Sequence, residues 1–327
     1  MIAIAISSFG GPEVLRPAVR PNPVANAGEV VIRIRAAGVS RADIMQRQGK
    51  YPPPPGASDI PGLDVAGTVD SVGSGVVGLD PGDRVCAILA GGGYAEFCSV
   101  PTVQVLPIPD RWSFVEAASL PENFFTVYDN LITRAALKSG ETVLIHGGSS
   151  GIGTTAIMLS RAWGAIPFVT AGTDAKCAAC VQLGSEYAIN YKQFDFLAEI
   201  KRLTNGAGVS VVVDLVGAPY LAKNLDCLAL EGRITVVSTQ GGRTAELDMS
   251  KLMMKRARVM GSTMRVRTPE QKGEVARGLL RDVWPMLRAK NPIRPVIDST
   301  FPLSDARLAH QRMETGEHIG KIVLTAG

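Results

Sequence analysis

The chain has 327 residues, of which 46% are hydrophobic and 20% charged, and its formal net charge at pH 7 is +4. This balance is typical of a folded globular protein, and the length suggests two domains. The positive charge is dispersed, with no basic run longer than the Lys-Arg-Ala-Arg of residues 255–258, so neither nucleic acid nor a membrane is an expected partner.

The cellular location follows from what the sequence does not contain. No apolar stretch reaches the roughly 18 residues that a membrane-spanning helix needs, and the first seven residues lack the basic region of a signal peptide. Five cysteines, an odd number, fit a reducing compartment better than a disulfide framework. We therefore expect a cytoplasmic protein.

Residues 1 to about 110 are predicted to be rich in β-structure. Short strands with turn residues between them indicate a small barrel-like unit, interrupted by one helix at 41–48; the expected strands are 2–6, 29–35, 64–72 and 83–89. After the helix, Tyr51 is followed by four prolines, which stiffen the loop. The sequence leaves open whether this loop is a surface spacer or the wall of a pocket.

From Pro121 onward the pattern changes to alternating helices and strands. A helix at about 123–137 precedes short apolar strands separated by helical segments, which is typical of a doubly wound parallel sheet; these strands are expected at 142–146, 166–170, 187–190, 209–214, 232–238 and 257–262. Residues 267–327 return to mixed character and end in a strand at 321–325. If this last segment rejoins the first domain, a cleft between the two domains would hold the active site.

A glycine-rich turn joins the first of these strands to a helix. The strand at 142–145 leads into His-Gly-Gly-Ser-Ser-Gly-Ile-Gly at 146–153, and an apolar helical pattern begins at Ile152. Such a turn presents backbone N–H groups and a helix N-terminus to a phosphate, and its glycines allow close approach of a pyrophosphate. The arrangement predicts a dinucleotide site.

The second strand indicates which dinucleotide. In NAD-binding folds an acidic residue about 20 residues past the glycines binds the ribose 2′-hydroxyl, but no carboxylate ends the strand at 166–170. Asp174 lies further along, where capping of the next helix explains it. Thr173 and Lys176 are suited to bind a 2′-phosphate, although a solvated helix face would also explain Lys176. NADPH is the expected cofactor.

Metal ligands are scarce in the sequence. There are three histidines, and Cys177-Ala-Ala-Cys180 is a single pair on a predicted helix, where two core-facing cysteines are the simpler explanation. Without a metal or a histidine base, alcohol oxidation lacks its usual proton acceptor. Hydride transfer to an electron-poor compound mainly needs the reactants held together in a dry site.

One motif points to a different family. The glycine pattern and the Tyr-x-x-x-Lys of Tyr220 and Lys223 both occur in short-chain dehydrogenases. That family begins with its glycine motif, whereas about 140 residues precede it here, and Tyr220 follows the fourth strand too closely. We interpret the match as coincidence.

Six segments together resemble the zinc-free quinone oxidoreductases of the medium-chain dehydrogenase/reductase superfamily, the zeta-crystallin branch. The resemblance covers nearly the whole chain and is closest to the bacterial and p53-inducible NADPH:quinone oxidoreductase type. The segments are 10–15, 37–43, 46–58, 91–96, 146–153 and 316–324.

The resemblance implies a two-domain α/β fold. Residues 1–122 and 265–327 would form a chaperonin-10-like catalytic domain, and residues 123–264 a Rossmann domain that binds NADPH. It also implies a homodimer formed through the edges of the Rossmann sheets, with the strand at 257–262 as the pairing edge.

The resemblance also implies roles for individual residues. The pyrophosphate would lie against Gly148, Ser149, Gly151, Ile152 and Gly153, and the 2′-phosphate and adenosine against Gly172, Lys176 and Tyr191. The nicotinamide half would be bordered by Thr126, Ser238, Gln240, Thr263, Met264 and Lys321. The catalytic pocket for the electron acceptor would contain Ser40, Asp43, Tyr51 and Asn123.

Ser40 departs from the family pattern, which usually has Asn-x-x-Asp at this point. Serine keeps a hydrogen-bonding group but is shorter, so its contact would be lost or bridged by water. Substrate preference is therefore less certain than cofactor binding.

The expected activity is hydride transfer from NADPH to a quinone, with Tyr51 and Ser40 orienting or protonating the carbonyl oxygen. Two alternatives stay open at this point. One is a reductase of enones or 2-alkenals on the same fold, and the other is a largely non-catalytic NADPH- or RNA-binding protein of the crystallin kind.

Overall fold

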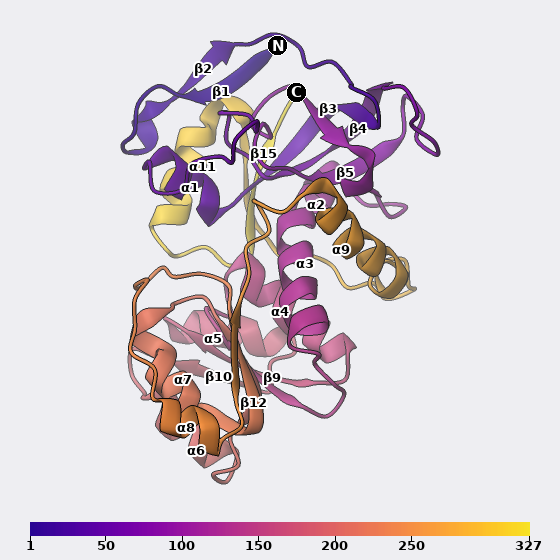
Figure 1. The fold of residues 1–327 in the computed structure, drawn as a ribbon. Coiled ribbons are helices and arrows are strands. Elements are labelled where there is room, and N and C mark those ends of the chain that lie inside the picture. Colours follow the sequence, from indigo (N-terminus) through magenta and orange to yellow (C-terminus); the bar gives the residue numbers. More distant parts are fainter. The chain divides into compact units, whose positions relative to one another are not determined.

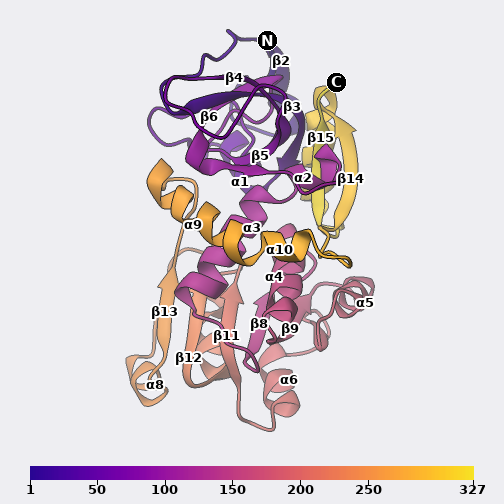
Figure 2. The same cartoon turned by 90° about the vertical axis from the view of Figure 1, so that its right-hand side faces the viewer.

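The computed structural model describes all 327 residues and shows two compact units (Figures 1 and 2). Unit 1 comprises Met1–Phe125 and Met264–Gly327, and unit 2 comprises Thr126–Thr263. The chain therefore starts in unit 1, builds unit 2 without interruption and returns. No helix has both the length and the apolar character that crossing a membrane requires.

Unit 2 is built on a six-stranded sheet in which every pairing is parallel. The strand order is β10-β9-β8-β11-β12-β13, which is the doubly wound order with β8 as its first strand. The strands are β8 (Thr142–His146), β9 (Ile166–Ala171), β10 (Tyr187–Asn190), β11 (Val209–Asp214), β12 (Leu228–Val236) and β13 (Arg258–Gly261). The α/β fold class predicted from the sequence is confirmed, and β13 lies at an edge of the sheet.

Helices connect these strands, and the central strand β8 is buried. The helices are α4 (Gly151–Ala162), α5 (Asp174–Gln182), α6 (Phe196–Leu203), α7 (Leu221–Cys227) and α8 (Met249–Met254). Val143, Leu144 and Ile145 of β8 are completely buried, as expected of a parallel strand covered on both faces. From β8 the chain continues to β9 and β10 on one side, and it later returns to β11 on the other side of β8. The carboxyl end of β8 is therefore the switch point where such folds bind ligands.

The helix expected at 123–137 is α-helical only in its first half. α3 (Pro121–Val127) continues as a π-helical segment, Tyr128–Arg134. Asn130 explains the change, because its side chain donates to the Thr126 carbonyl (2.9 Å) and accepts from the Thr235 hydroxyl (2.5 Å). The expected helix is therefore present, but its second half is π-helical and it ends at Arg134.

Unit 1 contains a mainly antiparallel sheet in the order β14-β15-β3-β4-β5-β7, with β6 also paired to β3. Its strands are β3 (Glu29–Val39), β4 (Asp64–Val72), β5 (Arg84–Ile88), β6 (Phe97–Pro101), β7 (Val105–Pro107), β14 (Ile297–Pro302) and β15 (Lys321–Thr325). A separate pair, β1 (Ile2–Ile6) and β2 (Leu15–Val19), completes the β-structure. Its α-helices are α1 (Arg41–Arg47), α2 (Phe114–Ala118), most of α3, α9 (Pro269–Asp282), α10 (Trp284–Leu287) and α11 (Ala306–Glu314).

The last strand of the chain returns to the first domain, as the sequence suggested. β15 pairs antiparallel with β3, and Ile322 lies opposite Val39. This register places Lys321 beside Ser40, the residue that follows β3. Two parts of unit 1 almost 300 positions apart in the sequence therefore meet at one point.

The cysteines are all free. Cys180 is buried in α5, whereas Cys177 is only partly buried. The expectation that both would face the core is therefore wrong for Cys177.

Candidate active site

The glycine-rich turn at the carboxyl end of β8 is shaped by backbone contact. Ser150 caps α4, since its Oγ accepts from the Gly153 amide (3.0 Å) and donates to the Gly147 carbonyl (2.8 Å). A Cβ on Gly153 would lie 2.3 Å from the Gly147 oxygen, and one on Gly148 would lie 2.6 Å from Val169 Cβ. Neither position has room for a side chain.

This turn leaves backbone donors for a ligand. Gly151 and Ile152 are the first two residues of α4, and amides in these positions have no acceptor within the helix. They lie at the positive end of the helix dipole, where anions bind. Two of the predicted pyrophosphate residues, Gly151 and Ile152, therefore offer amides that could hold a phosphate group.

The residues expected around the 2′-phosphate gather at the carboxyl ends of β9 and β10. A Cβ on Gly172 would lie 2.9 Å from the Tyr191 hydroxyl, and the Tyr191 amide donates to the Ala171 carbonyl (3.1 Å). Thr173 caps α5, accepting from the Lys176 amide (3.2 Å). Lys176 follows in the first turn of that helix.

The helix cap differs from the expectation for Asp174. The cap is Thr173, and Asp174 is the first residue of α5. The Asp174 carboxylate accepts from Asn190 (2.6 Å) and Gln193 (3.3 Å). It is therefore occupied in joining α5 to the end of β10.

The residues predicted to border the nicotinamide belong to both units. In unit 2, Ser238 and Gln240 follow β12, Thr263 follows β13, and Thr126 lies in α3. Met264 and Lys321 belong to unit 1.

His146 ends β8 directly before the glycines, and it has a structural role. Its ring nitrogens are 2.7 Å from Asn224 Oδ1 and 3.0 Å from Thr170 Oγ1. The ring is completely buried, and burial lowers its pKa to about 4, against the raising effect of Asn224. His146 is therefore neutral at pH 7.

The Tyr-x-x-x-Lys match has no catalytic geometry. The Tyr220 ring packs 4.8 Å from the His146 ring, centroid to centroid. The Lys223 ammonium is paired with Asp195 at 2.5 Å. The two residues contact different partners, in agreement with the interpretation as coincidence.

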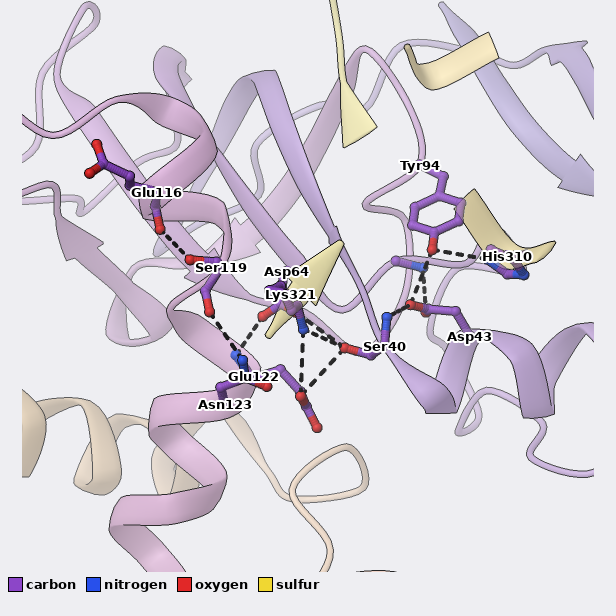
Figure 3. A network of polar contacts seen from close by, with 11 residues as sticks. Ser40, Asp43, Asp64, Tyr94, Glu116, Ser119, Glu122, Asn123, His310 and Lys321 are labelled. Atoms are coloured by element: carbon purple, nitrogen blue, oxygen red, sulfur yellow. Dashed lines mark hydrogen bonds and ion pairs between the residues drawn. The ribbon is translucent and has the colours of Figure 1, made fainter. Parts of the chain in front are cut away.

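Unit 1 contains a buried polar cluster, which we define as Ser40, Asp64, Glu122 and Lys321 (Figure 3). Lys321 Nζ lies 2.7 Å from Asp64 Oδ2, 2.8 Å from Ser40 Oγ and 3.7 Å from Glu122 Oε2. Ser40 Oγ is also 3.3 Å from Asp64 Oδ2 and 3.4 Å from Glu122 Oε2. The Glu122 backbone amide donates to the second oxygen of Asp64.

Burial and the neighbouring charges shift the pKa values in this cluster. Burial raises the pKa of Glu122 to about 7. Lys321 lowers this pKa, and the negative charges of Asp64 and Asp43 offset part of that lowering. Burial alone would lower the pKa of Lys321, but the attraction of Asp64 and Glu122 raises it overall. Lys321 is therefore charged at neutral pH, whereas Glu122 gains or loses its proton near pH 7.

Asp43 faces away from Lys321, on the other side of Ser40 (Figure 3). Its carboxylate accepts from the amides of Ser40 (2.8 Å) and Gly62 (2.9 Å) and from the Tyr94 hydroxyl (3.3 Å). Tyr94 in turn lies 3.0 Å from His310 Nε2. Burial raises the pKa of Asp43 to about 6, although both amides lower it. Asp43 thus fixes the start of α1.

Tyr51 is held by a buried arginine. Arg265 donates to the Tyr51 carbonyl (3.1 Å), the Ala90 carbonyl (2.8 Å) and Gln46 Oε1 (2.6 Å). Its guanidinium carbon also lies 5.2 Å from the centre of the Tyr51 ring. Burial raises the pKa of Tyr51, as does the charge of Glu122, and Arg265 opposes them. The Tyr51 phenol therefore stays protonated at neutral pH.

Asn123 lies apart from these contacts. Its side chain donates to the Ser119 carbonyl at 3.3 Å, one turn back in the chain. The structure therefore joins Ser40 and Lys321 in one cluster and ties Asp43 to Ser40 through its amide. Asp64, Glu122 and Arg265 were not predicted from the sequence.

Two family models match the chain. Residues 26–110 match the alcohol dehydrogenase GroES-like domain, and residues 151–279 match the zinc-binding dehydrogenase family. Human quinone oxidoreductase is 31% identical over 332 residues, which cover 99% of this chain and 97% of the human protein.

Solved structures share the fold over the full length. A mycobacterial protein described as complexed with NADPH has a TM-score of 0.88 and 29% identity, covering 99% of this chain and 100% of that one. The JamJ enoyl reductase has a TM-score of 0.89 and 28% identity, covering 100% of this chain and 99% of that one.

The zinc named by one of these family models does not fit the residues present. No group of three or more His, Cys, Asp or Glu side chains could hold a metal ion. The carboxylates of Asp64 and Glu122 face an ammonium, that of Lys321, which already supplies a positive charge. We derive no catalytic step through a metal.

Proposed function

Because this chain belongs to the medium-chain dehydrogenase/reductase superfamily, among its quinone oxidoreductase-like members, we propose that it is an NADPH-dependent quinone reductase. On the motifs of its sequence, we place it with the p53-inducible type. NADPH, when bound, supplies the hydride from its nicotinamide C4.

The observation that carries the proposal is the set of hydrogen-bond donors in unit 1. The Ser40 hydroxyl and the Lys321 ammonium share one cluster, and the Tyr51 phenol is kept protonated near Glu122. Such groups orient a carbonyl oxygen and stabilise negative charge that develops on it. An electron-poor quinone needs these donors rather than a strong base.

NADPH is proposed over NADH for two reasons. Lys176 brings a positive charge to the first turn of α5, which begins two residues after Gly172. The carboxylate of Asp174 in the same turn is occupied by Asn190 and Gln193. The mycobacterial relative was also solved with NADPH. The glycine turn would hold the pyrophosphate of either cofactor.

A reductase of activated alkenes is the second candidate. The similarity to the JamJ enoyl reductase favours it, because the same donors would stabilise an enolate oxygen. In that reaction the hydride is added to the β-carbon of an α,β-unsaturated carbonyl compound, and no quinone is involved.

The test is steady-state oxidation of NADPH and NADH with an ortho-quinone, a para-quinone and an α,β-unsaturated aldehyde. We expect quinone turnover with NADPH well ahead of NADH. Lys176→Met should raise the KM for NADPH about tenfold or more, the loss of one charge-assisted contact, and leave that for NADH unchanged. Lys201→Met, an exposed lysine of α6, is the control. Turnover confined to the aldehyde would establish the alkene reductase instead.

We also propose that the protein forms a homodimer through β13. This strand ends the sheet of unit 2, so one side of its backbone has no partner within the sheet. Exposed apolar side chains lie on it and on the preceding helix α8, namely Val259, Met253 and Met254.

A further inference from the structure

We propose that Glu122 is the proton donor of the reduction, protonating the oxygen of the electron acceptor when hydride has been added. This role presupposes the proposed reductase activity. It makes Glu122, absent from the residues predicted from sequence, a catalytic residue that touches the substrate.

The position of Glu122 differs from that of the other charged members of the cluster. Asp64 is completely buried and Lys321 is 4% exposed, whereas the Glu122 side chain is 22% exposed. Its Oε2 lies near Ser40 and Lys321, and its Oε1 has no hydrogen-bond partner in the structure. Figure 3 shows its carboxyl group directed away from Asp64. Glu122 is thus the charged group through which the cluster can reach a ligand.

The charge balance of the region favours a proton on Glu122. Two carboxyl groups, those of Asp64 and Glu122, face one ammonium, and the Asp43 carboxyl group lies on the other side of Ser40. Lys321 lies 2.7 Å from Asp64 but 3.7 Å from Glu122, so its charge mainly neutralises Asp64. Burial and the two other carboxylates raise the pKa of Glu122 to about 7 despite Lys321 and Ser40. A donor with a pKa near the working pH is effective as both acid and base.

Other groups that face Glu122 are less suited to this role. Lys321 donates to Asp64 and Ser40, and its pKa is raised. Tyr51, the remaining titratable neighbour, also has a raised pKa. Both hold their protons at pH 7, so neither is expected to supply the proton, and Glu122 does.

The proton balance of the reaction requires such a group. A quinone and NADPH together need one proton to give a hydroquinone and NADP⁺. Addition of hydride brings two electrons to the quinone and leaves one of its oxygens anionic. The O–H bond of Glu122 breaks as a new O–H bond forms on that oxygen. The resulting carboxylate is stabilised by Lys321 and regains its proton from water.

The experiment compares the pH profiles of kcat/KM for a quinone and for an enone. In the wild type, kcat/KM should fall as the pH rises above about 7 and Glu122 ionises. Glu122→Gln should lower kcat/KM at pH 6 by about a hundredfold, the lower end of the usual effect of a general acid. It should also abolish the fall near pH 7. The loss should be larger for the enone, because its enolate is the stronger base.

Glu116→Gln is the matched control. Glu116 lies in the neighbouring helix α2, and its side chain is 23% exposed, close to the 22% of Glu122. It pairs with Arg294, and its pKa is lowered. This variant should keep both the rate and the pH profile.

A measurement without substrate tests the protonation itself. Infrared spectra of the full-length protein should show a protonated carboxyl C=O band, additional to that of Asp43, that disappears as the pH rises through about 7 and is missing in Glu122→Gln. If Glu122→Gln does not fold, Glu122→Asp serves instead, and it should keep the fall in kcat/KM near pH 7.

The outcomes separate the two proposals. If the wild type reduces neither acceptor, the proposed function fails and the donor role fails with it. If it turns over and Glu122→Gln keeps the same pH profile, the donor role alone is wrong. Absence of the infrared band would also overturn the donor role.

Discussion

Gly153 is a residue of the glycine turn at which backbone geometry excludes any side chain. A Cβ there would lie 2.3 Å from a backbone oxygen, that of Gly147, and a backbone atom cannot move aside as a flexible side chain does. Gly153→Ala should therefore force the turn open, lower the free energy of unfolding by about 1–3 kcal/mol, and raise the Kd for NADPH about tenfold or more. Thermal unfolding and fluorescence titration measure the two effects.

Gly261→Ala is the control for this substitution. A Cβ at Gly261 would have its nearest neighbour, the Val236 oxygen, at 3.4 Å, which is an ordinary contact. This variant should bind NADPH like the wild type. Equal affinities of both variants would mean that the turn does not hold the cofactor.

The sequence predicted those site residues whose role depends on their immediate neighbours in the chain. The glycine turn could be predicted because strand, glycines and helix are consecutive in the chain. Glu122 could not, because its role depends on Asp64, Ser40 and Lys321, which come from three distant segments. Nothing in the sequence near Pro121 indicates that these groups share one ammonium.

Among the elements, the parallel strands of unit 2 could be predicted most reliably. Their apolar runs are short, buried on both faces and separated by helices, so each one is visible in the sequence. The π-helical segment at 128–134 was not predicted, because it depends on a hydrogen bond from Thr235 to Asn130 across the fold. The pairing of β15 with β3 was expected only as a return of the chain, and its register had to come from the structure.

The edge strand β13 is the proposed contact between two copies of the chain. If two copies pair along it, a lysine on the exposed side of the edge should place like charges close together and prevent the contact. Val259→Lys should convert a dimer to a monomer, as measured by light scattering after gel filtration. Val259 is 38% exposed, so the substitution should not disturb the core.

Val266→Lys is the control, at a valine of unit 1 that is 60% exposed. It should leave the molecular mass unchanged. A wild-type monomer, or a Val259→Lys dimer as stable as the wild type, would contradict pairing through β13.

Across the whole molecule, buried ionisable groups are distributed unequally between the two units. Unit 1 holds His310, whose pKa is lowered to about 3 by burial and by Arg47. It also holds Asp43 and Glu122, whose pKa values burial raises to about 6 and about 7. In unit 2, the pKa of His146 is lowered to about 4. Burial raises the pKa of Asp214, so its effect on the pH dependence of stability has the opposite sign.

These pKa shifts predict that lowering the pH decreases the free energy of unfolding of unit 2 before that of unit 1. Folded His146 stays neutral at pH 5, whereas in the unfolded chain its pKa is 6.5, so unfolding takes up a proton. The stability that neutral His146 provides is complete above pH 6.5 and decreases as the pH falls. Between pH 7 and 5 the loss due to His146 is about 2 kcal/mol, because the slope of about 1.36 kcal/mol per pH unit applies only below pH 6.5.

Unit 1 responds with the opposite sign. In the folded state Asp43 and Glu122 stay protonated up to about pH 6 and about pH 7. In the unfolded chain the same groups have pKa values of 3.8 and 4.5, so at pH 5 unfolding releases their protons. This release on unfolding offsets the proton that His310 takes up, so acidification to pH 5 should not destabilise unit 1. Carboxylates with lowered pKa values, such as Glu141 in unit 2 and Asp298 in unit 1, lose their contribution only below about pH 4.5.

Hydrogen exchange at pH 7 and pH 5, read by mass spectrometry, reports opening free energies for peptides of each unit. Peptides of β8 and β11 should lose about 2 kcal/mol at pH 5, and peptides of β3 and β4 should lose none. His146→Gln removes the ionisable ring, so unit 2 of this variant should be less stable at both pH values but lose nothing further between them. An equal loss in both units, or a persistent loss in His146→Gln, would show that His146 does not set the acid sensitivity of unit 2.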